Sequence, residues 1–296
     1  MNVRRPLSVL VVALALVAAL AAAPAAHAGI HYKADTTLTP QKGRPQVTKV
    51  EAWVDGPRAK VEFHESDQPM LQAGDYLVTQ DGGKTLFLVN PQEKTYSKWD
   101  LEGMLAVFGN VMESMKGLVN LDFSDPKVEK LAEESGGEIL GYPTTHYKYR
   151  TSYTTKIKVL GMHRESTTET VQDLWTTKAF GDSGLSVWLR NEPPRTGNEQ
   201  IDKLISAQMS QIQGFPLKTE SVSTTTGQKG KHESTARQET VVTELEKVGV
   251  PDSTFEIPKG YTETQMMPEG QEKGKDQDEK NPFSRLFGKK KSGGGH

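Results

Sequence analysis

Histidine is the first residue type to consider, because general acid–base catalysis and zinc binding both commonly use it. Of the seven histidines, six lie beyond residue 28: His31, His64, His146, His163, His232 and His296. No two of these are three to five residues apart, and none begins an H-E-x-x-H motif, so their spacing predicts no zinc site. The tripeptide His-Glu-Ser occurs at His64 and at His232, in alternating polar segments typical of solvated strands. We interpret this recurrence as a chance result of amino-acid composition, and we do not predict a functional site there.

Motifs for nucleophilic catalysis and phosphate binding are also missing. The chain has no Cys, which excludes thiol nucleophiles and thiolate metal sites. It has no G-x-S-x-G elbow, and the loop at residues 227–231 lacks the Gly-Lys-Ser/Thr ending of a P-loop, so we interpret that loop as a hairpin turn. Carboxylates are plentiful, but a glycosidase pair is defined by its spacing in three dimensions. Sequence alone does not give that spacing, so an exported hydrolase stays a hypothesis, ranked third after the two functions given below. We predict that the protein is not an enzyme and uses no cofactor.

Methionine and phenylalanine offer a different chemistry, which is apolar contact. Three methionines recur at helical spacing beside Phe108, and such a surface is deformable enough to accommodate varied apolar partners. A stripe of this kind is more often plain core, so each residue taken singly favours core over ligand contact. Alternating strand-like runs supply an opposite apolar wall. We predict a hydrophobic cavity or groove lined by Val61, Phe63, Leu86, Leu88, Met104, Phe108, Met112 and Met115, and no metal site.

The elements that position these residues can be predicted from periodicity. Residues 30–99 contain short runs with alternating apolar positions, such as 58–63 and 84–89, separated by the turn signals Asp-Gly-Pro, Asp-Gly-Gly and Asn-Pro. This pattern predicts antiparallel hairpins with one buried face. A three- and four-residue period over 101–119 predicts a broad amphipathic helix, and residues 125–135 predict a shorter helix that ends at Gly136-Gly137.

Strand-like composition returns after residue 137 and continues to residue 189. A second amphipathic helix is predicted over 198–213, stopped by Gly214, and two long polar strands are predicted at 215–226 and 231–248. Strands and helices in this order lack a regular βαβ rhythm. We therefore predict an α+β, β-dominated fold, in which helices cover the concave face of a curved antiparallel sheet or incomplete β-barrel.

The two ends of the chain differ from this body. Residues 1–28 combine a basic start, an apolar run and an Ala-His-Ala end, which predicts a cleaved signal peptide and a periplasmic or secreted protein; a membrane anchor is the alternative. Without Cys, the mature chain cannot be a lipoprotein. We predict a single domain over 29–261 and a disordered charged tail over 262–296. The segment 283–291 joins apolar and basic residues, which allows weak contact with an anionic membrane, although a solubilising tail end is favoured.

The overall charge argues against one class of partner. The 36 Lys and Arg nearly balance the 38 Asp and Glu, giving a net charge of −2, and the mean hydropathy is −0.58. Nucleic-acid-binding domains normally carry a clear basic excess. We therefore predict no nucleic-acid partner, and the polar composition excludes a polytopic membrane protein.

Five sequence segments, taken in order, resemble a family of exported bacterial proteins known chiefly as a domain of unknown function. That family is itself similar to the LolA/LolB lipoprotein-carrier superfamily. The five segments are VDGPRAKVE at 54–62, NPQEKTY at 90–96, EILGYPTTHY at 138–147, FPLK at 215–218 and VPDSTFEIPKGY at 250–261. The resemblance implies a LolA-like curved sheet whose concave apolar face holds acyl chains. It does not fix an equivalent of the carriers' lid-closing arginine, for which Arg58 is a candidate.

Two functions follow from the pattern and the resemblance. The leading hypothesis is an extracytoplasmic, non-enzymatic binding protein or carrier for a lipid, an acyl chain or a lipoprotein. The alternative is an envelope protein-interaction or stress-sensor module that uses the same fold without a ligand.

Overall fold

The computed structural model of the protein describes residues 28–68, 71–99, 119–159, 162–180, 199–210 and 213–265. By its contacts the chain divides into two units, Met1–Thr264 and Gln265–His296, and every element described below belongs to the first. The predicted signal peptide, and nearly all of the predicted tail with its weak membrane contact, lie outside the described residues. Those predictions, and the predicted domain boundaries, stay predictions.

Strands dominate the described chain. Six lie in its first part: β1 (Ala28–Pro40), β2 (Gln46–Asp55), β3 (Arg58–Ser66), β4 (Tyr76–Thr79), β5 (Leu86–Asn90) and β6 (Thr95–Trp99). Six more follow: β7 (Val119–Ile139), β8 (Tyr142–Val159), β9 (Met162–Thr177), β10 (Phe215–Gly227), β11 (His232–Gly249) and β12 (Thr262–Glu263). The helical elements are α4 (Glu199–Met209) and two short 3-10 helices, η1 (Gln228–Gly230) and η2 (Asp252–Phe255).

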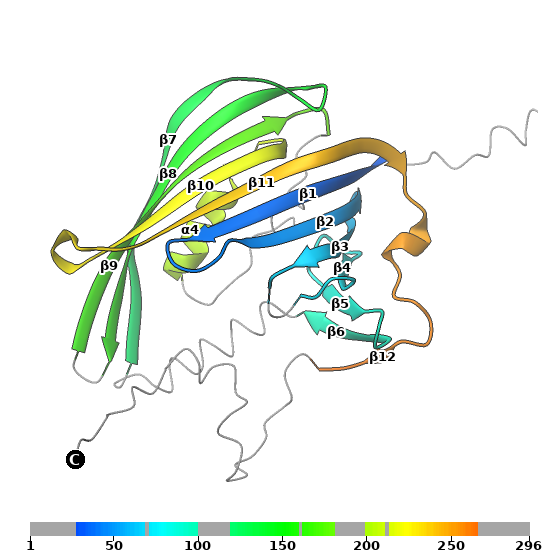
Figure 1. The fold of residues 1–296 in the computed structure, drawn as a ribbon, viewed down its shortest axis with the longest axis horizontal. Helices are drawn as coiled ribbons and strands as arrows, with labels where there is room; N and C mark the ends of the chain where they lie inside the picture. Colours follow the sequence, from blue (N-terminus) through cyan, green and yellow to red (C-terminus); the bar gives the residue numbers. More distant parts are fainter. Residues whose placement is uncertain are drawn as a thin grey trace, which may run out of the picture. The chain divides into compact units, whose positions relative to one another are not determined.

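All twelve strands form one sheet, in the order β12-β6-β5-β4-β3-β2-β1-β11-β10-β9-β8-β7 (Figure 1). Neighbouring strands are antiparallel except β12 and β6, which are parallel. The strand at the start of the described chain lies in the middle of the sheet, because β1 pairs with β2 on one side and with β11 on the other. The β-dominated fold predicted from the sequence is therefore confirmed, as one large open sheet with β7 and β12 at its edges.

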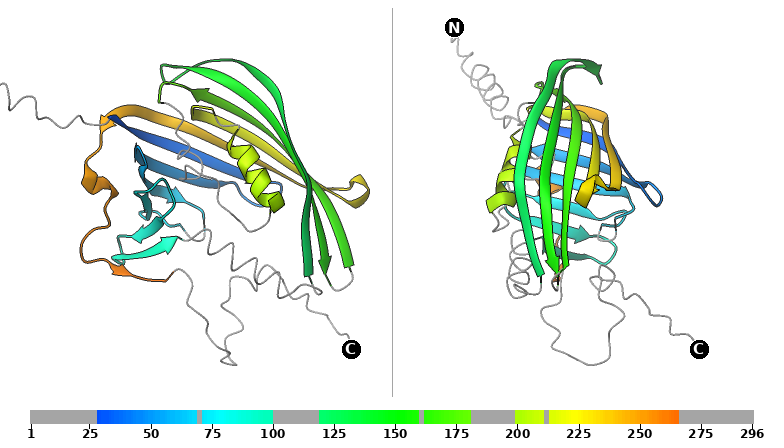
Figure 2. Two further views of the ribbon diagram at one scale, coloured as in Figure 1. Left: turned by 180° about the vertical axis from the view of Figure 1, so that it is seen from behind. Right: turned by 90° about the vertical axis from the view of Figure 1, so that its left-hand side faces the viewer.

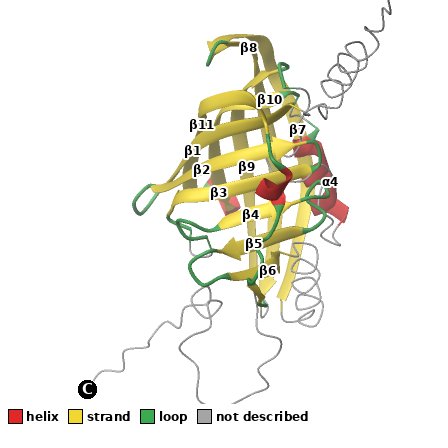
Figure 3. Cartoon of the chain, turned by 90° about the vertical axis from the view of Figure 1, so that its right-hand side faces the viewer, coloured by secondary structure: helices red, strands yellow, loops and turns green. Residues whose placement is uncertain are grey.

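The sheet is curved, so that β7–β9 lie opposite β1–β6 across one of its faces (Figures 2 and 3). Successive side chains of a strand point to opposite faces, so the strand register assigns each residue to a face. We call the face that carries Ile30, Tyr32 and Ala34 the inner face, and the opposite one the outer face. Phe180, which follows β9, packs against the buried inner-face residues, with its ring centroid 5.8 Å from that of Phe215.

Hydrophobic clusters lie on both faces of the sheet. The inner cluster is built from β1, β2, β3, β10 and β11. The outer cluster combines Tyr76 and Val78 of β4, Val89 of β5 and Phe255 of η2. Because η2 also contacts β3, the segment after β11 covers part of the outer face, as Figure 3 shows. The sheet is thus buried on both sides at β3–β5. A third, smaller cluster is formed by Tyr147, Tyr149 and Leu174 of β8 and β9.

The predicted short helix over 125–135 is wrong, because these residues belong to β7 and pair with β8. Their Lys, Glu, Leu and Ala content favours a helix locally. The neighbouring β8 is rich in Thr and Tyr, and pairing with it overrides that local preference. The conflict is visible in the register, which shifts three times along β7, between Ser124 and Lys127, between Lys130 and Ala132, and between Ser135 and Gly137.

Helices contribute little to the described residues. The second predicted helix is present as α4, shorter than the predicted span of 198–213, and it contacts the edge strand β7. The helix predicted over 101–119 lies outside the described residues except at Val119, which begins β7. The described part of the chain therefore does not show helices covering the concave face. No helix within this part is long and apolar enough to cross a membrane.

The strand pairing also reaches into the predicted tail. Thr262 and Glu263 form β12, where the Thr262 N–H donates to the Lys94 carbonyl at 2.9 Å and the Thr264 N–H donates to the Tyr96 carbonyl at 2.7 Å. The ordered chain therefore continues a few residues past the predicted boundary at Tyr261.

Gly214, immediately before β10, should tolerate no side chain. Its φ is +83°, and an added Cβ would lie 2.6 Å from the Thr177 carbonyl oxygen. Gly137 has a similar φ of +74° with no atom within 4 Å of an added Cβ, so it is the matched control for backbone strain alone. We expect Gly137→Ala to lower the free energy of unfolding by about 1 kcal/mol and Gly214→Ala by more than about 2 kcal/mol, measured by urea denaturation. Equal losses would show that the close approach at Gly214 does not constrain the fold.

Candidate functional site

The inner face has a continuous apolar region in the middle of the sheet. Phe63 of β3 pairs with Val50 of β2, which pairs with Ala34 of β1, which in turn pairs with Val242 of β11. The next row, Val61, Ala52, Tyr32 and Leu245, repeats this arrangement. In the row after it, Ala59, Val54 and Ile30 are apolar, but the β11 residue is Lys247. We call this set the apolar region: Ile30, Tyr32, Ala34, Val50, Ala52, Val54, Ala59, Val61, Phe63, Phe215, Leu217, Val242 and Leu245. Strands far apart in the sequence thus contribute to one apolar surface.

Four of the predicted ligand-contacting residues lie on this inner face. Val61 and Phe63 of β3 belong to the apolar region and are each 7% exposed. Leu86 and Leu88 of β5 share the same face, because Val61 pairs with Leu77 and Leu77 pairs with Leu88. Leu86 is buried and Leu88 is half-buried. The structure therefore brings this predicted wall together.

The other predicted wall is outside the described residues. Met104, Phe108, Met112 and Met115 all fall in the segment 100–118, which the structure does not describe. The cavity between the two walls therefore stays a prediction.

Beyond the apolar region, the inner face changes from apolar to hydroxyl side chains. On β1 the series Ile30, Tyr32, Ala34 continues with Thr36, and on β2 the series ending at Val50 continues with Thr48. We call the following set the hydroxyl region: Thr36, Thr48, Thr151, Thr168, Thr170, Thr219, Ser221, Ser223, Thr225 and Thr240. Its members are buried or half-buried, and sequence analysis did not identify them as a group.

Hydroxyl groups in this region are paired across neighbouring strands. Thr170 Oγ1 lies 2.8 Å from Ser223 Oγ, and Thr168 Oγ1 lies 3.1 Å from Thr225 Oγ1, both between β9 and β10. Thr36 Oγ1 lies 3.0 Å from Thr240 Oγ1, between β1 and β11. Each hydroxyl group has one donor and two acceptor positions, so a pair keeps hydrogen-bonding capacity beyond its mutual contact.

The outer face carries two histidines in matching surroundings. His31 stacks on Trp53 with ring centroids 5.2 Å apart, and its Nε2 and Nδ1 lie 2.7 Å from Glu51 and 2.8 Å from Glu246. The three carboxylate and imidazole groups come from β2, β1 and β11, so the cluster joins three neighbouring strands.

His146 of β8 repeats this arrangement near the β7 edge of the sheet. It stacks on Trp175 with ring centroids 4.6 Å apart, and its Nε2 and Nδ1 lie 2.8 Å from Asp173 and 3.1 Å from Glu134. These residues come from β7, β8 and β9. We interpret both clusters as cross-strand connections rather than catalytic sites. Within the described ranges, no group of three or more His, Cys, Asp or Glu is placed to hold a metal ion.

The two remaining sequence candidates lie on the outer face. His64 is exposed there, and its Nε2 lies 2.9 Å from Glu51. The Arg58 guanidinium forms ion pairs with Asp252 and Asp55, which raise the pKa of Arg58 above its ordinary value, and it lies 4.8 Å from the centroid of the Phe255 ring. Arg58 therefore holds η2 against the outer face and does not face the apolar region.

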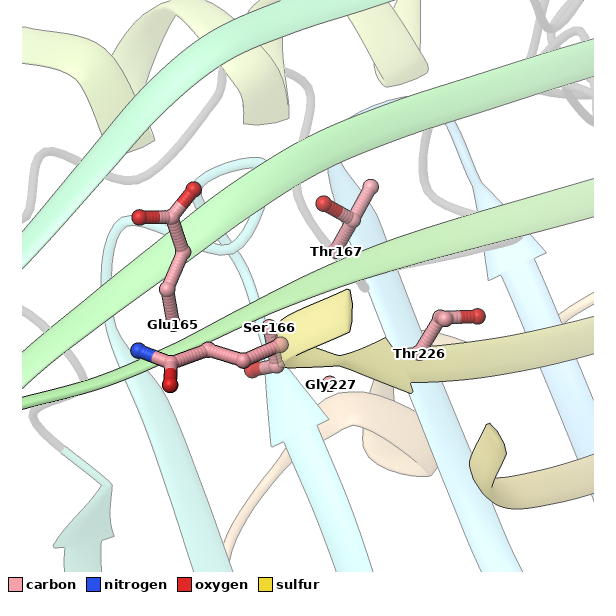
Figure 4. Close-up of a pocket in the computed structure, with 6 residues that line it drawn as sticks. Glu165, Ser166, Thr167, Thr226 and Gly227 are labelled. Atoms are coloured by element: carbon pink, nitrogen blue, oxygen red, sulfur yellow. The ribbon is translucent and has the colours of Figure 1, made fainter. Parts of the chain in front are cut away.

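A pocket of about 420 Å³ lies at the paired ends of β9 and β10, beside η1 (Figure 4). It is lined by Glu165, Ser166, Thr167, Thr226, Gly227 and Gln228. The loop that follows is a hairpin turn, as predicted, since η1 connects β10 to β11. The lining is polar, so this pocket does not correspond to the predicted apolar cavity.

Comparison with known proteins gives one family match. The model of the family described as "Domain of unknown function (DUF4412)" matches residues 54–261. A search of curated proteins finds no match.

Several solved structures are similar over most of their length at low identity. One is an uncharacterized conserved protein from Thermus thermophilus, with 10% identity, a TM-score of 0.33 and coverage of 79% of this chain and 90% of that chain. A LolA superfamily protein from Nitrosomonas europaea has 9% identity, a TM-score of 0.30 and coverage of 78% and 90%. A DUF1329 family protein from Desulfovibrio piger has 11% identity, a TM-score of 0.30 and coverage of 82% and 95%.

The His31 cluster should make stability depend on pH through Glu51. Burial alone would raise the pKa of Glu51, but hydrogen bonds from His31 and His64, with the charges of His31 and Lys33, lower it below its ordinary value of 4.5. A lowered folded-state pKa stabilises the fold above that ordinary value, and the contribution is lost as the pH falls through the folded-state pKa. We expect Glu51→Gln to lower the free energy of unfolding by roughly 1–3 kcal/mol at pH 7, with the difference from wild type shrinking below pH 4.5.

Glu246→Gln is the control, because Glu246 accepts from the other nitrogen of His31 but its side chain is 64% exposed, against 19% for Glu51. It should cost less than about 1 kcal/mol. Urea denaturation at pH 7 and pH 3 measures both variants. A loss in Glu51→Gln that stays constant with pH would refute this assignment.

Proposed function

We propose that this chain, which belongs to the DUF4412 family, binds the apolar chain of a lipid, an acyl group or a lipoprotein on the inner face of its sheet and catalyses no reaction on it. The observation that supports this proposal most directly is the apolar region, which extends across β3, β2, β1 and β10 and along β11 as far as Leu245, after which Lys247 is the next inner-face residue of β11. A concave apolar surface is the usual setting of a site for an apolar ligand.

The half-buried edge of this surface is the part most accessible to a ligand. Leu77 and Leu88 lie directly opposite each other on β4 and β5, next to Val61, and both are only half-buried. Burial of an acyl chain against such a surface contributes about 0.8 kcal/mol per CH₂ group. Contact with eight or more CH₂ groups would therefore be enough for measurable binding.

An extracytoplasmic location is part of this proposal. The described sheet begins at Ala28, so removal of residues 1–28 as a signal peptide would take away only the first residue of β1. The sequence resemblance to lipoprotein carriers points to the same location and the same class of ligand. The proposed partners are accordingly a hydrophobic ligand or a lipoprotein.

One observation favours the alternative, an envelope protein-interaction or stress-sensor module. The residues at the centre of the apolar region are already closely packed, with Ala52 and Leu217 both 0% exposed. If the whole inner face is filled in this way, the fold has a core there and no room for a guest. Lipid extraction and native mass spectrometry of protein purified from its own envelope distinguish the two functions, since only a carrier should release a bound lipid.

Substitution of Leu88 gives a sharper test. We expect Leu88→Asn to weaken binding of dodecanoic acid about tenfold, or about 1.4 kcal/mol, because a polar group then faces the acyl chain. Phe87→Asn is the matched control, since Phe87 is also half-buried on β5 but lies on the outer face, where it contacts Tyr96. It should lower stability and leave binding unchanged. Isothermal titration calorimetry measures affinity, and urea denaturation measures stability.

A charged residue at Phe108, on the wall predicted from the sequence, should also weaken binding more than it lowers stability. If neither Leu88→Asn nor Phe108→Lys changes dodecanoic acid binding, the ligand does not lie on the inner face. If wild-type protein binds no acyl probe at all, the interaction-module alternative is favoured.

A further inference from the structure

We propose that the hydroxyl region binds the polar part of the same ligand, and that this part is uncharged and rich in hydroxyl groups, as in a glycosyl or glycerol group. This inference rests on the proposed function, because it assigns a second half to the same binding surface. An amphiphile would then lie along the strands, with its acyl chain on the apolar region and its polar group on the hydroxyl region.

The first support is that the change of character occurs at the same level on β2, β1, β11 and β10, whereas in that row β9 and β8 carry the buried residues Leu174 and Tyr147. Ala34, Val50 and Val242 lie in one row, and Thr36, Thr48 and Thr240 lie in the next. On β10 the change follows Leu217, and hydroxyl side chains then occupy alternate positions from Thr219 to Thr225. At about 3.3 Å per residue, this stretch is about 20 Å long, which is enough for a disaccharide. On these four strands the inner face therefore passes from an apolar to a hydroxyl-rich surface, although Leu38 of β1 follows Thr36 on the same face.

The second support is the contrast between the two faces of the same strands. On β9 the inner-face residues Thr168 and Thr170 alternate with Glu169, and on β10 the inner-face residues Thr219 and Ser221 alternate with Glu220. Solvated strands commonly carry charged residues, as the outer face does here. If the inner positions were simply solvated, charge would be expected on them too. They are polar without being charged, which is the composition of a surface adapted to a neutral polar group.

Absence of charge decides the class of polar group. Within the described residues, no charged side chain lies on the inner face along β1, β2 and β10, or between Ser166 and Thr176 of β9. Charged residues lie at the two ends of this surface: Arg164 of β9 beyond Ser166, and Lys247 of β11 in the row of Ile30. A phosphate or ammonium group taken out of water requires an opposite charge. Beyond β8, the edge strand β7 carries Lys130 and Glu133 on the inner face, where they form an ion pair with each other. Hydroxyl groups need only donors and acceptors, which Thr and Ser supply.

The test compares probes that share a dodecyl chain and differ in the polar group: n-dodecyl-β-maltoside, dodecylphosphocholine and dodecanoic acid, each below its micelle concentration. Isothermal titration calorimetry with the full mature chain should show the tightest binding for the maltoside. The double variant Thr168→Val with Thr225→Val removes an inner-face hydroxyl pair and keeps β-branched side chains. It should weaken maltoside binding about three- to tenfold and change dodecanoic acid binding less than twofold.

The sheet supplies a matched control for this variant. Thr154 and Thr167 form an equivalent Thr–Thr contact of 3.2 Å between neighbouring strands, but on the outer face. Thr154→Val with Thr167→Val should therefore leave the binding of all three probes unchanged. Circular dichroism checks the folding of each variant. If the first inner-face variant fails to fold, Thr170→Val with Ser223→Ala tests the same region.

The outcomes separate this inference from the proposed function. If all three probes bind with equal affinity, or if inner and outer variants weaken maltoside binding equally, the hydroxyl region does not recognise a neutral polar group, while acyl binding stands. Tighter binding of dodecylphosphocholine than of the maltoside would also overturn the inference. If none of the probes binds, the proposed function fails and this inference fails with it.

Discussion

Pairing of β1 with β11 is the constraint on which the rest of the structure depends. The two strands are more than 150 residues apart in the sequence, yet their register extends from Ala28 and Gly249 to Pro40 and Ala236. This ladder joins the meander of β2–β6 to the meander of β7–β10. The apolar region draws on both meanders, so it exists only because of this one long-range contact. A shift of one residue here would exchange inner and outer side chains on half of the sheet.

Local pattern was sufficient to predict the first meander. Asp55-Gly56-Pro57 lies at the turn between β2 and β3, and the alternation of Ala59, Val61 and Phe63 places these residues on one face, as predicted. The family prediction is also confirmed, since the DUF4412 match covers 54–261. The helix predicted over 125–135 is wrong for a reason that a local pattern does not contain. Its residues favour a helix by composition, and only the partner strand β8 makes them a strand.

The candidate site was predicted in part. Val61, Phe63, Leu86 and Leu88 were found because apolar alternation is a strong signal. The hydroxyl region was missed because Thr is common in strands for reasons of backbone preference alone. A short signal was present in the alternation of hydroxyl and charged residues, as in Thr168-Glu169-Thr170 and Thr219-Glu220-Ser221. The two histidine clusters had no such signal, since each depends on residues from three strands whose register cannot be derived from spacing.

The edges of this open sheet bear on how the protein avoids self-association. An exposed edge strand offers unpaired backbone groups to any other strand, which is the first step of fibril growth. One edge, β12, has only two residues, and the other, β7, contains Pro126, several exposed charges and three irregularities of register. A second chain approaching β7 would meet a ladder that it cannot continue in regular register. The irregular strand that sequence composition marked as a helix thus protects a large open sheet from polymerising.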